Sequence, residues 1–325
     1  MKTAVKTKEK KVLKRLVKIL IFIVLILVIG FLAFSYYIGK QVAVNLVMQN
    51  EGLDTKANSV KQLEEWGYDY KSFQSLYKGK NIILVSEGGN EVPVTFFSID
   101  GNYDRDTVIL IHGAGGDHTS MYPIAEFYLE NNWNVAAIDQ RASGDSKNTL
   151  VTFGHFEKND IVPLVEYIKG KTNNKKIVLH GQSMGAATVG LYVATEHANQ
   201  NIDYCIMDSS YDSMKGIFLV IWHSMDTGIP DDYVITCGNW YLKRHYAFEF
   251  EDVDVVAAQA NNMIPTLVIH GTKDDFCFSS MGEEIYNNIA AEKKEIWLVD
   301  SGHIEACIDY PDEYAKKVLT FINKY

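Results

Sequence analysis

A pentapeptide of the form Gly-x-Ser-x-Gly, residues 181–185, lies between a short apolar segment and a run of small residues. The apolar segment, residues 176–180, is typical of a buried strand, and residues 184–196 are typical of a helix that packs closely on a sheet. The two glycines of the pentapeptide permit a sharp turn, which would expose the hydroxyl of Ser183. The sequence therefore predicts a strand, a tight turn and a helix, with a candidate nucleophile at the turn.

Short apolar segments alternate with helical patterns along most of the chain, which has 325 residues, 47% of them hydrophobic. Residues 81–86 and 92–99 predict an antiparallel opening pair, because turn residues separate them. Further strands are predicted at residues 107–112, 133–138, 176–180, 202–207, 266–270 and 295–299. Helices are predicted at residues 120–131, 160–168, 184–196, 279–289 and 311–322. This alternation indicates an α/β fold with a mostly parallel central sheet and helices on both faces.

Residues 212–260 interrupt the alternation, because they contain many aromatic residues and no strand pattern. One interpretation is an extra helical layer with its own small core. The other is a cap over the active site that shapes the substrate pocket, and the two interpretations are compatible. We expect a helical cap insertion over about residues 212–260.

The N-terminal region combines a basic tail with a long apolar segment. Residues 1–18 contain eight Lys and Arg residues and one acid, and residues 19–38 are almost entirely apolar. Twenty helical residues span about 30 Å, the thickness of the bilayer hydrocarbon, so we expect a transmembrane helix. A cleavable signal peptide is the alternative, because Ala33-Phe34-Ser35 has the spacing of a cleavage site, although the apolar segment is long for one.

The basic tail also predicts the orientation of the chain in the membrane. Positive residues stay on the cytoplasmic side, which places the chain from about Gly39 onward outside the cell. We expect a helical lead-in segment at residues 39–80 and the α/β domain at residues 81–325. The whole chain has a net charge of −10, and the part beyond the tail is more acidic still, which disfavours nucleic acid as a partner.

Three loops that follow predicted strands carry residues suited to acyl transfer. The glycine-rich loop at residues 112–118 points backbone amides at a ligand, and we expect the amides of Ala114 and Met184 to form an oxyanion hole. A phosphate-binding loop is the alternative, but the Walker ending is missing. Neither a Cys-x-x-Cys pair nor a His-Glu-x-x-His motif occurs, so the sequence predicts no metal and no cofactor.

The other two loops supply an acid and a base. Asp274 follows the strand at residues 266–270 and is predicted to orient a histidine, with Asp275 as the alternative. His303 follows the strand at residues 295–299 and is the predicted base. We expect His112 to orient the oxyanion loop, and His180 and His270 to bond local backbone. The remaining histidines are expected at the surface or in the cap: His118, His155, His197, His223 and His245.

The order Ser183, Asp274, His303 is the order of the α/β-hydrolases, and the chain from about residue 81 resembles that superfamily. Within it, the chain is most similar to the membrane-anchored or exported Bem46-like and serine-aminopeptidase-like group. Further stretches carry the resemblance at residues 139–146, 152–160 and 264–271, and the oxyanion loop also resembles that of monoacylglycerol lipases. The resemblance implies structural roles for Asp139, Arg141 and Asp160. One departure is Phe276-Cys277-Phe278, where many relatives have an apolar residue followed by proline.

The resemblance and the loops together predict a membrane-tethered, extracytoplasmic serine hydrolase. It would cleave an ester of a small-molecule or lipid-like acyl substrate through an acyl-enzyme. A peptidase or amidase with the same three residues is one alternative, and a catalytically silent binding protein is another. We also consider a disulfide between Cys277 and Cys307, because the acid and histidine loops must converge; two unpaired thiols are the alternative.

Overall fold

The computed structural model describes residues 2–173 and 175–325, and the chain divides into two compact units. The smaller unit combines Met1–Asn45 with Ile229–Glu249, and the larger combines Leu46–Gly228 with Phe250–Tyr325. Residues 229–249 of the predicted cap therefore belong to the unit that contains the N-terminal helix.

The larger unit is built on an eight-stranded sheet with the order β1-β2-β4-β3-β5-β6-β7-β8. β1 pairs antiparallel with β2, β2 pairs antiparallel with β4, and all other neighbours are parallel. The predicted opening pair and the mostly parallel sheet are thus confirmed. The strands are β1 (Gly79–Val85), β2 (Glu91–Phe97), β3 (Thr107–Ile111), β4 (Asn134–Ile138), β5 (Ile177–Gln182), β6 (Tyr204–Asp208), β7 (Thr266–Gly271) and β8 (Lys294–Val299).

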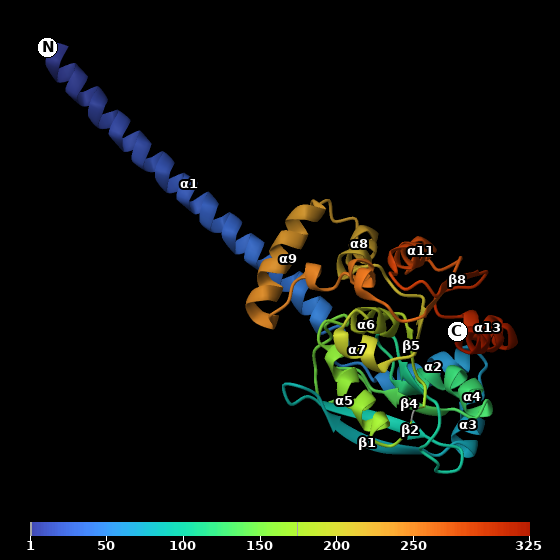
Figure 1. The fold of residues 1–325 in the computed structure, drawn as a ribbon. Coiled ribbons are helices and arrows are strands. Elements are labelled where there is room, and N and C mark those ends of the chain that lie inside the picture. The colour runs from blue at the N-terminus through green and yellow to red at the C-terminus, as the bar shows by residue number, and fades with distance from the viewer. Residues whose placement is uncertain (1, 174) are drawn as a thin grey trace. The chain divides into compact units, whose positions relative to one another are not determined.

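Helices cover both faces of this sheet (Figure 1). The larger unit contains α2 (Thr55–Glu65), α3 (Tyr70–Leu76), α4 (Tyr122–Glu130), α5 (Glu157–Lys169), α6 (Met184–Tyr192), α7 (Glu196–Asn201), α8 (Met214–Ser224), α10 (Val255–Ala258), α11 (Ser279–Asn288), α12 (Ala306–Asp309), α13 (Pro311–Lys324) and the 3-10 helices η1 (His118–Met121), η2 (Phe250–Asp252) and η3 (Gln259–Asn261). α5 packs against α6 on one face, and α2, α3, α4 and α13 share a continuous apolar core on the other.

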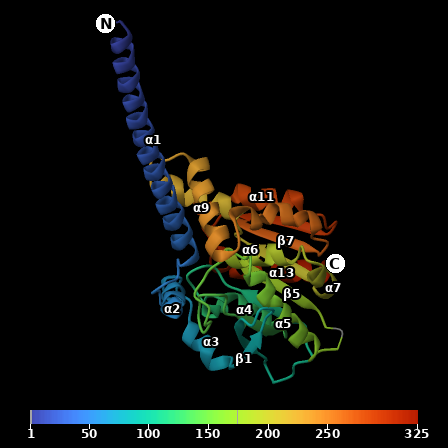
Figure 2. The same ribbon diagram turned by 90° about the vertical axis from the view of Figure 1, so that its left-hand side faces the viewer.

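The central strands are buried on both faces, which explains their uninterrupted apolar sequences. Every residue of β3 to β7 is buried, whereas β1 and β8, at the two edges of the sheet, are partly exposed. In Figure 2, β1 lies at one end of the unit and β7 with α11 at the other. This order places β5, which precedes Ser183, in the interior of the sheet.

One helix is shorter than predicted, and a separate helix follows it. The sequence predicts a single helix at residues 184–196, but α6 ends at Tyr192 and α7 begins at Glu196. Thr195 starts the second helix, because its side chain accepts a hydrogen bond from the amide of Ala198 and so caps the first turn.

The smaller unit pairs a long helix with a shorter one. α1 (Lys2–Val47) runs beyond the predicted apolar span, and α9 (Asp231–Tyr246) packs on it through aromatic side chains. Tyr36 lies edge-on to Trp240, with ring centroids 6.0 Å apart, and Ser35 hydrogen-bonds Tyr233. Gly39 permits the close approach, since a Cβ there would collide with the carbonyl of Cys237.

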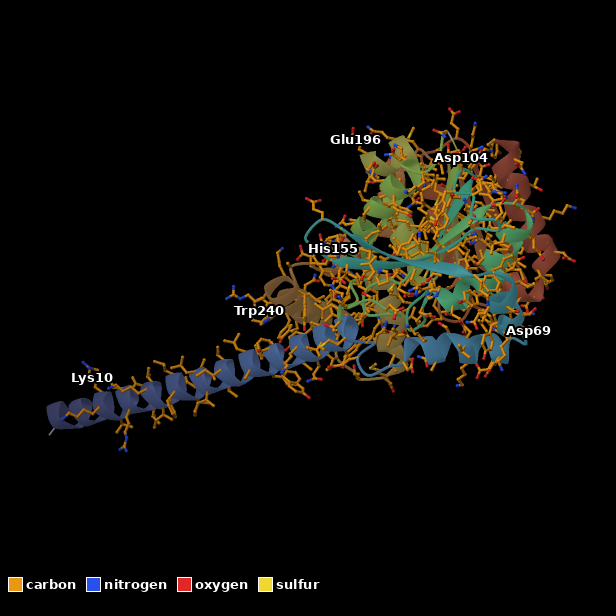
Figure 3. The ribbon with its side chains drawn as sticks, turned by 90° about the horizontal axis from the view of Figure 1, so that it is seen from below. Lys10, Asp69, Asp104, His155, Glu196 and Trp240 are labelled. Carbon is orange, nitrogen blue, oxygen red and sulfur yellow. The ribbon has the colours of Figure 1, made fainter. Side chains whose placement is uncertain are left out.

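The apolar part of α1 is exposed along most of its length. Its side chains project outward between Lys10, labelled near the N-terminal end in Figure 3, and the region that packs on α9. The segment Lys10–Val47 is long and apolar enough to cross a membrane, and none of its most apolar 18-residue stretch is buried. Helices of this length and composition occur both as membrane anchors and as signal sequences.

Candidate active site

Ser183 occupies a strained turn between β5 and α6. Its φ is +52° and its ψ −121°, a conformation that non-glycine residues adopt only where their surroundings impose it, at a cost of about 1–3 kcal/mol. The flanking glycines are sterically required, because a Cβ at Gly185 would collide with the Ile111 carbonyl and one at Gly181 with the Gly185 carbonyl. The turn places the serine hydroxyl at the carboxyl end of the sheet.

His303 and Asp274 complete a chain of hydrogen bonds that starts at this hydroxyl. His303 Nε2 lies 2.9 Å from Ser183 Oγ, and His303 Nδ1 lies 2.6 Å from Asp274 Oδ2. The three residues follow β5, β7 and β8, so parallel strands bring together positions far apart in the sequence. Asp275, the alternative acid, is exposed. In this arrangement a hydroxyl proton can pass to an imidazole that a carboxylate orients.

The environment of Asp274 keeps its carboxylate ionised. Burial alone would raise its pKa, but His270 Nε2, 3.5 Å away, and the hydrogen bond from His303 outweigh burial and hold the pKa well below its usual range. Its other oxygen, Oδ1, accepts the amides of Phe276 and Cys277 at 3.0 and 2.8 Å. One oxygen therefore shapes the loop, while the other bonds the histidine.

The glycine-rich loop after β3 lies against Ser183. A Cβ at Gly113 would lie 3.2 Å from the Cβ of Ser183. Among residues 2–173 and 175–325, the backbone amides of Ala114 and Met184 find no protein acceptor. Ala114 directly follows Gly113 and Met184 directly follows Ser183, so the binding of a negatively charged oxygen by these two amides stays a prediction.

His112 holds this loop in place. Its Nε2 accepts the amide of Gln140 at 3.0 Å, so the ring proton lies on Nδ1, which donates to the carbonyl of Gly113 at 2.7 Å. Complete burial lowers the pKa of His112 and keeps the ring neutral, as this bonding pattern requires. The side chain thus connects the loop after β3 to the residues after β4.

The expectation that His118 lies at the surface is wrong. Its side chain is only 13% exposed, and its Nδ1 lies 2.8 Å from Asp139 Oδ1. Burial opposes protonation of the ring, but the hydrogen bond and charge of Asp139 raise the pKa of His118. Burial likewise opposes ionisation of Asp139, yet the bond and charge of His118 lower its pKa to about 2. This pair was not predicted, because no sequence motif links the two residues.

Asp117 joins this pair in a cluster compact enough to hold a metal ion. However, the oxygens of the two carboxylates already accept protein donors: Thr119 bonds both oxygens of Asp117, while His118 and the amide of Asp145 bond those of Asp139. The hydrogen bonds of the cluster therefore join the loop after β3 to the loop after β4 without requiring an ion.

The His118–Asp139 pair should make stability depend on pH. The lowered pKa of Asp139 gives stability that is present above about pH 4 and lost as the pH falls toward 2, and the raised pKa of His118 gives stability present below about pH 6.5 and lost above it. We expect His118→Gln to lower the free energy of unfolding by about 2 kcal/mol near pH 5 and by less near pH 9. Urea unfolding across this range measures the difference.

The matched control is His197→Gln, which removes a more exposed histidine paired with Glu166 and should have little effect at any pH. A His118→Gln effect of the same size at pH 5 and pH 9 would contradict the ionic account of the pair.

The hypothesis of a disulfide between Cys277 and Cys307 is wrong in this structure, where both are free and buried thiols. The two thiols have different neighbours. The Cys307 thiol faces the side chain of Gln182 and the carbonyl of Ile304. The Cys277 thiol is near Asp274 and Asp212, and burial, together with the charges of these two carboxylates, raises its pKa. The two loops converge through the bond between Asp274 and His303 instead.

The two other histidines at strand ends, His180 and His270, have different kinds of hydrogen-bond partner. His270 bonds local backbone as expected, through the carbonyl of Cys277 at 2.7 Å. His180 instead bonds two tyrosine hydroxyls, those of Tyr128 and Tyr314. Arg141 and Asp160, expected to be structural, form a largely buried ion pair at 2.7 Å.

Comparison with known proteins points to the same architecture. A family model described as alpha/beta hydrolase fold matches residues 106–255. The esterase Pf2001 of Pyrococcus furiosus superposes with a TM-score of 0.63 at 21% identity, over 79% of this chain and 96% of that one. The chain has the α/β-hydrolase fold.

Two further comparisons cover most of the molecule. The Bacillus subtilis protein YqkD is 24% identical over 302 residues, which is 90% of this chain and 96% of YqkD. The esterase EaEST of Exiguobacterium antarcticum superposes with a TM-score of 0.56 at 16% identity, over 75% of this chain and all of EaEST (100%). The family model includes Ala114, Ser183 and Met184, and it ends before Asp274 and His303.

Proposed function

We propose that this protein is a serine hydrolase that cleaves carboxylic esters through a covalent acyl-enzyme. The observation that carries the proposal is the hydrogen-bonded series Ser183–His303–Asp274, which starts at a strained turn. The structurally similar proteins Pf2001 and EaEST are esterases, which supports an ester as the substrate.

The geometry supports the following steps. Ser183 Oγ attacks the ester carbonyl carbon while its proton passes to His303 Nε2, 2.9 Å away. The amides of Ala114 and Met184 stabilise the resulting oxyanion, and one such donor is typically worth about 3–4 kcal/mol. His303 then gives the proton to the departing alcohol oxygen. Water, activated by His303, cleaves the acyl-enzyme and releases the acid.

We further propose that α1 anchors the enzyme in the cell membrane with the hydrolase outside, as in the Bem46-like group. The support is the exposed apolar stretch of α1 together with the basic tail before it. The chain should then remain in the membrane pellet after alkaline carbonate washing. Release of the full-length chain into the supernatant would exclude the anchor.

The substrate class is tested with the full chain in detergent micelles. We expect turnover of p-nitrophenyl esters. The acyl-chain length that gives the highest kcat/KM would show which chain length the acyl pocket accepts best. Turnover of aminoacyl anilides without turnover of any ester would replace the esterase proposal with a peptidase. Turnover of neither class would favour a silent binding protein.

A further inference from the structure

Ile304, which directly follows His303, adopts a backbone conformation that branched residues avoid. Its φ is +55°, in the left-handed region where a Cβ-branched side chain crowds its own backbone. Such a conformation persists only where surrounding contacts impose it. The groups that hold the Ile304 main chain therefore also fix the direction in which the His303 ring points.

Buried side chains bind both polar groups of the Ile304 main chain. Its N–H donates to Ser209 Oγ at 3.2 Å, and its carbonyl lies 3.5 Å from Gln182 Nε2 and 3.7 Å from the thiol of Cys307. Ser209 and Gln182 are both buried and lie at the ends of β6 and β5. The histidine loop is thus tied to the two strands beside the serine.

A single carboxylate holds these two side chains. Asp208, the last residue of β6, accepts the Ser209 hydroxyl at Oδ1 (3.1 Å) and Gln182 Nε2 at Oδ2 (2.9 Å). A serine hydroxyl has one hydrogen, so donation to Asp208 directs a lone pair of its oxygen to the amide of Ile304. The backbone carbonyl of Asp208 also accepts the amide of Ser183 at 2.9 Å.

Two further side chains complete the buried network. Tyr314 donates its hydroxyl to Asp208 Oδ2 at 2.8 Å and accepts His180 Nε2, also at 2.8 Å, while Tyr128 donates to His180 Nδ1 at 3.3 Å. Burial lowers the pKa of His180 to about 3, so the ring is neutral and has one donor and one acceptor nitrogen, as this pattern requires. Every bond in the network therefore has a defined direction.

We propose that Asp208 is a positioning residue: through Ser209 and Gln182 it holds Ile304 in its left-handed conformation and so keeps His303 Nε2 against Ser183 Oγ. This inference rests on the proposed hydrolase function. The role differs from that of Asp274, which bonds the imidazole itself. Asp208 instead fixes the peptide from which the imidazole projects, and its own backbone fixes the serine.

The direct test is Ser209→Ala in the full chain, which removes the acceptor of the Ile304 amide and leaves the serine, histidine and both carboxylates in place. We expect kcat and the rate of fluorophosphonate labelling of Ser183 to fall about 10- to 100-fold, because a small misplacement of a reacting group has an effect of this size. KM should change little, since no substrate contact is removed.

The matched control is Ser86→Ala. Ser86 is also buried, and its hydroxyl donates to a different carboxylate, Asp160, at 2.6 Å. We expect both variants to lose thermal stability and only Ser209→Ala to lose labelling rate. If Ser209→Ala does not fold, Gln182→Met, which removes the side-chain amide that contacts the Ile304 carbonyl, should also slow labelling.

A double variant distinguishes a role in positioning His303 from a general loss of stability. Glycine adopts positive φ without strain, so Ser209→Ala should slow labelling less in an Ile304→Gly background than in the natural one. An unchanged labelling rate in Ser209→Ala, or an equal fall in both backgrounds, would overturn the positioning role while the hydrolase proposal stood. Absence of labelling in the unmodified chain would instead overturn the hydrolase proposal.

Discussion

Ser183→Ala should reduce ester turnover by about four to six orders of magnitude. The variant removes the atom that forms the acyl bond and keeps everything around it, because alanine can occupy the same strained turn at a cost similar to that of serine. Steady-state kinetics measures the loss, and the thermal unfolding midpoint should stay close to that of the unmodified chain. The effect should fall on kcat, since a hydroxyl contributes little to binding an ester.

The control for this prediction is again Ser86→Ala, which deletes a buried hydroxyl that bonds Asp160 and should leave turnover nearly unchanged. Turnover by Ser183→Ala at a tenth or more of the original rate would show that another residue supplies the nucleophile.

Asp274→Asn should lower kcat by about 10⁴-fold with the loop intact. The amide oxygen of asparagine can still accept the amides of Phe276 and Cys277, which Oδ1 accepts now. Its NH₂ group would then face His303 Nδ1, where the carboxylate oxygen lies at 2.6 Å. A donor at that position forces the ring proton onto Nε2, and the ring loses the lone pair that must take the serine proton.

Asp275→Asn provides the matched control, because it makes the same chemical change one residue away on an exposed side chain. We expect its kcat to stay within about twofold of the original value, as surface substitutions generally do little. Equal losses in the two variants, or a larger loss in Asp275→Asn, would reassign the acid. Thermal unfolding of Asp274→Asn checks that the loss of turnover is not a loss of fold.

The sequence contained enough information to predict the α/β-hydrolase fold. Strands buried on both faces read as uninterrupted apolar segments, and their alternation with helices indicates a parallel sheet. The same reasoning placed Ser183, Asp274 and His303 at the carboxyl ends of strands, where parallel pairing brings loops together. Their separation along the chain was no obstacle, because each residue was located by the strand before it.

Features that depend on contacts between loops could not be predicted in this way. His118 and Asp139 form a buried pair only because β3 and β4 are neighbours, and strand order is not encoded in either loop. The left-handed conformation of Ile304 has no local signal, since isoleucine does not favour it and distant residues impose it. The packing of α9 on α1 was also hidden, because an aromatic-rich helix does not specify which surface it will cover.

The central claim is that Ser183 is the nucleophile of a functional hydrolase, and mass mapping of a fluorophosphonate adduct tests it most directly. The full chain, labelled in detergent and digested with trypsin, should carry one phosphonyl group on the peptide of residues 177–215, and fragment ions should place it on Ser183. Heat-denatured protein and Ser183→Ala should carry none. An unlabelled native chain, or an adduct on any other residue, would contradict the account.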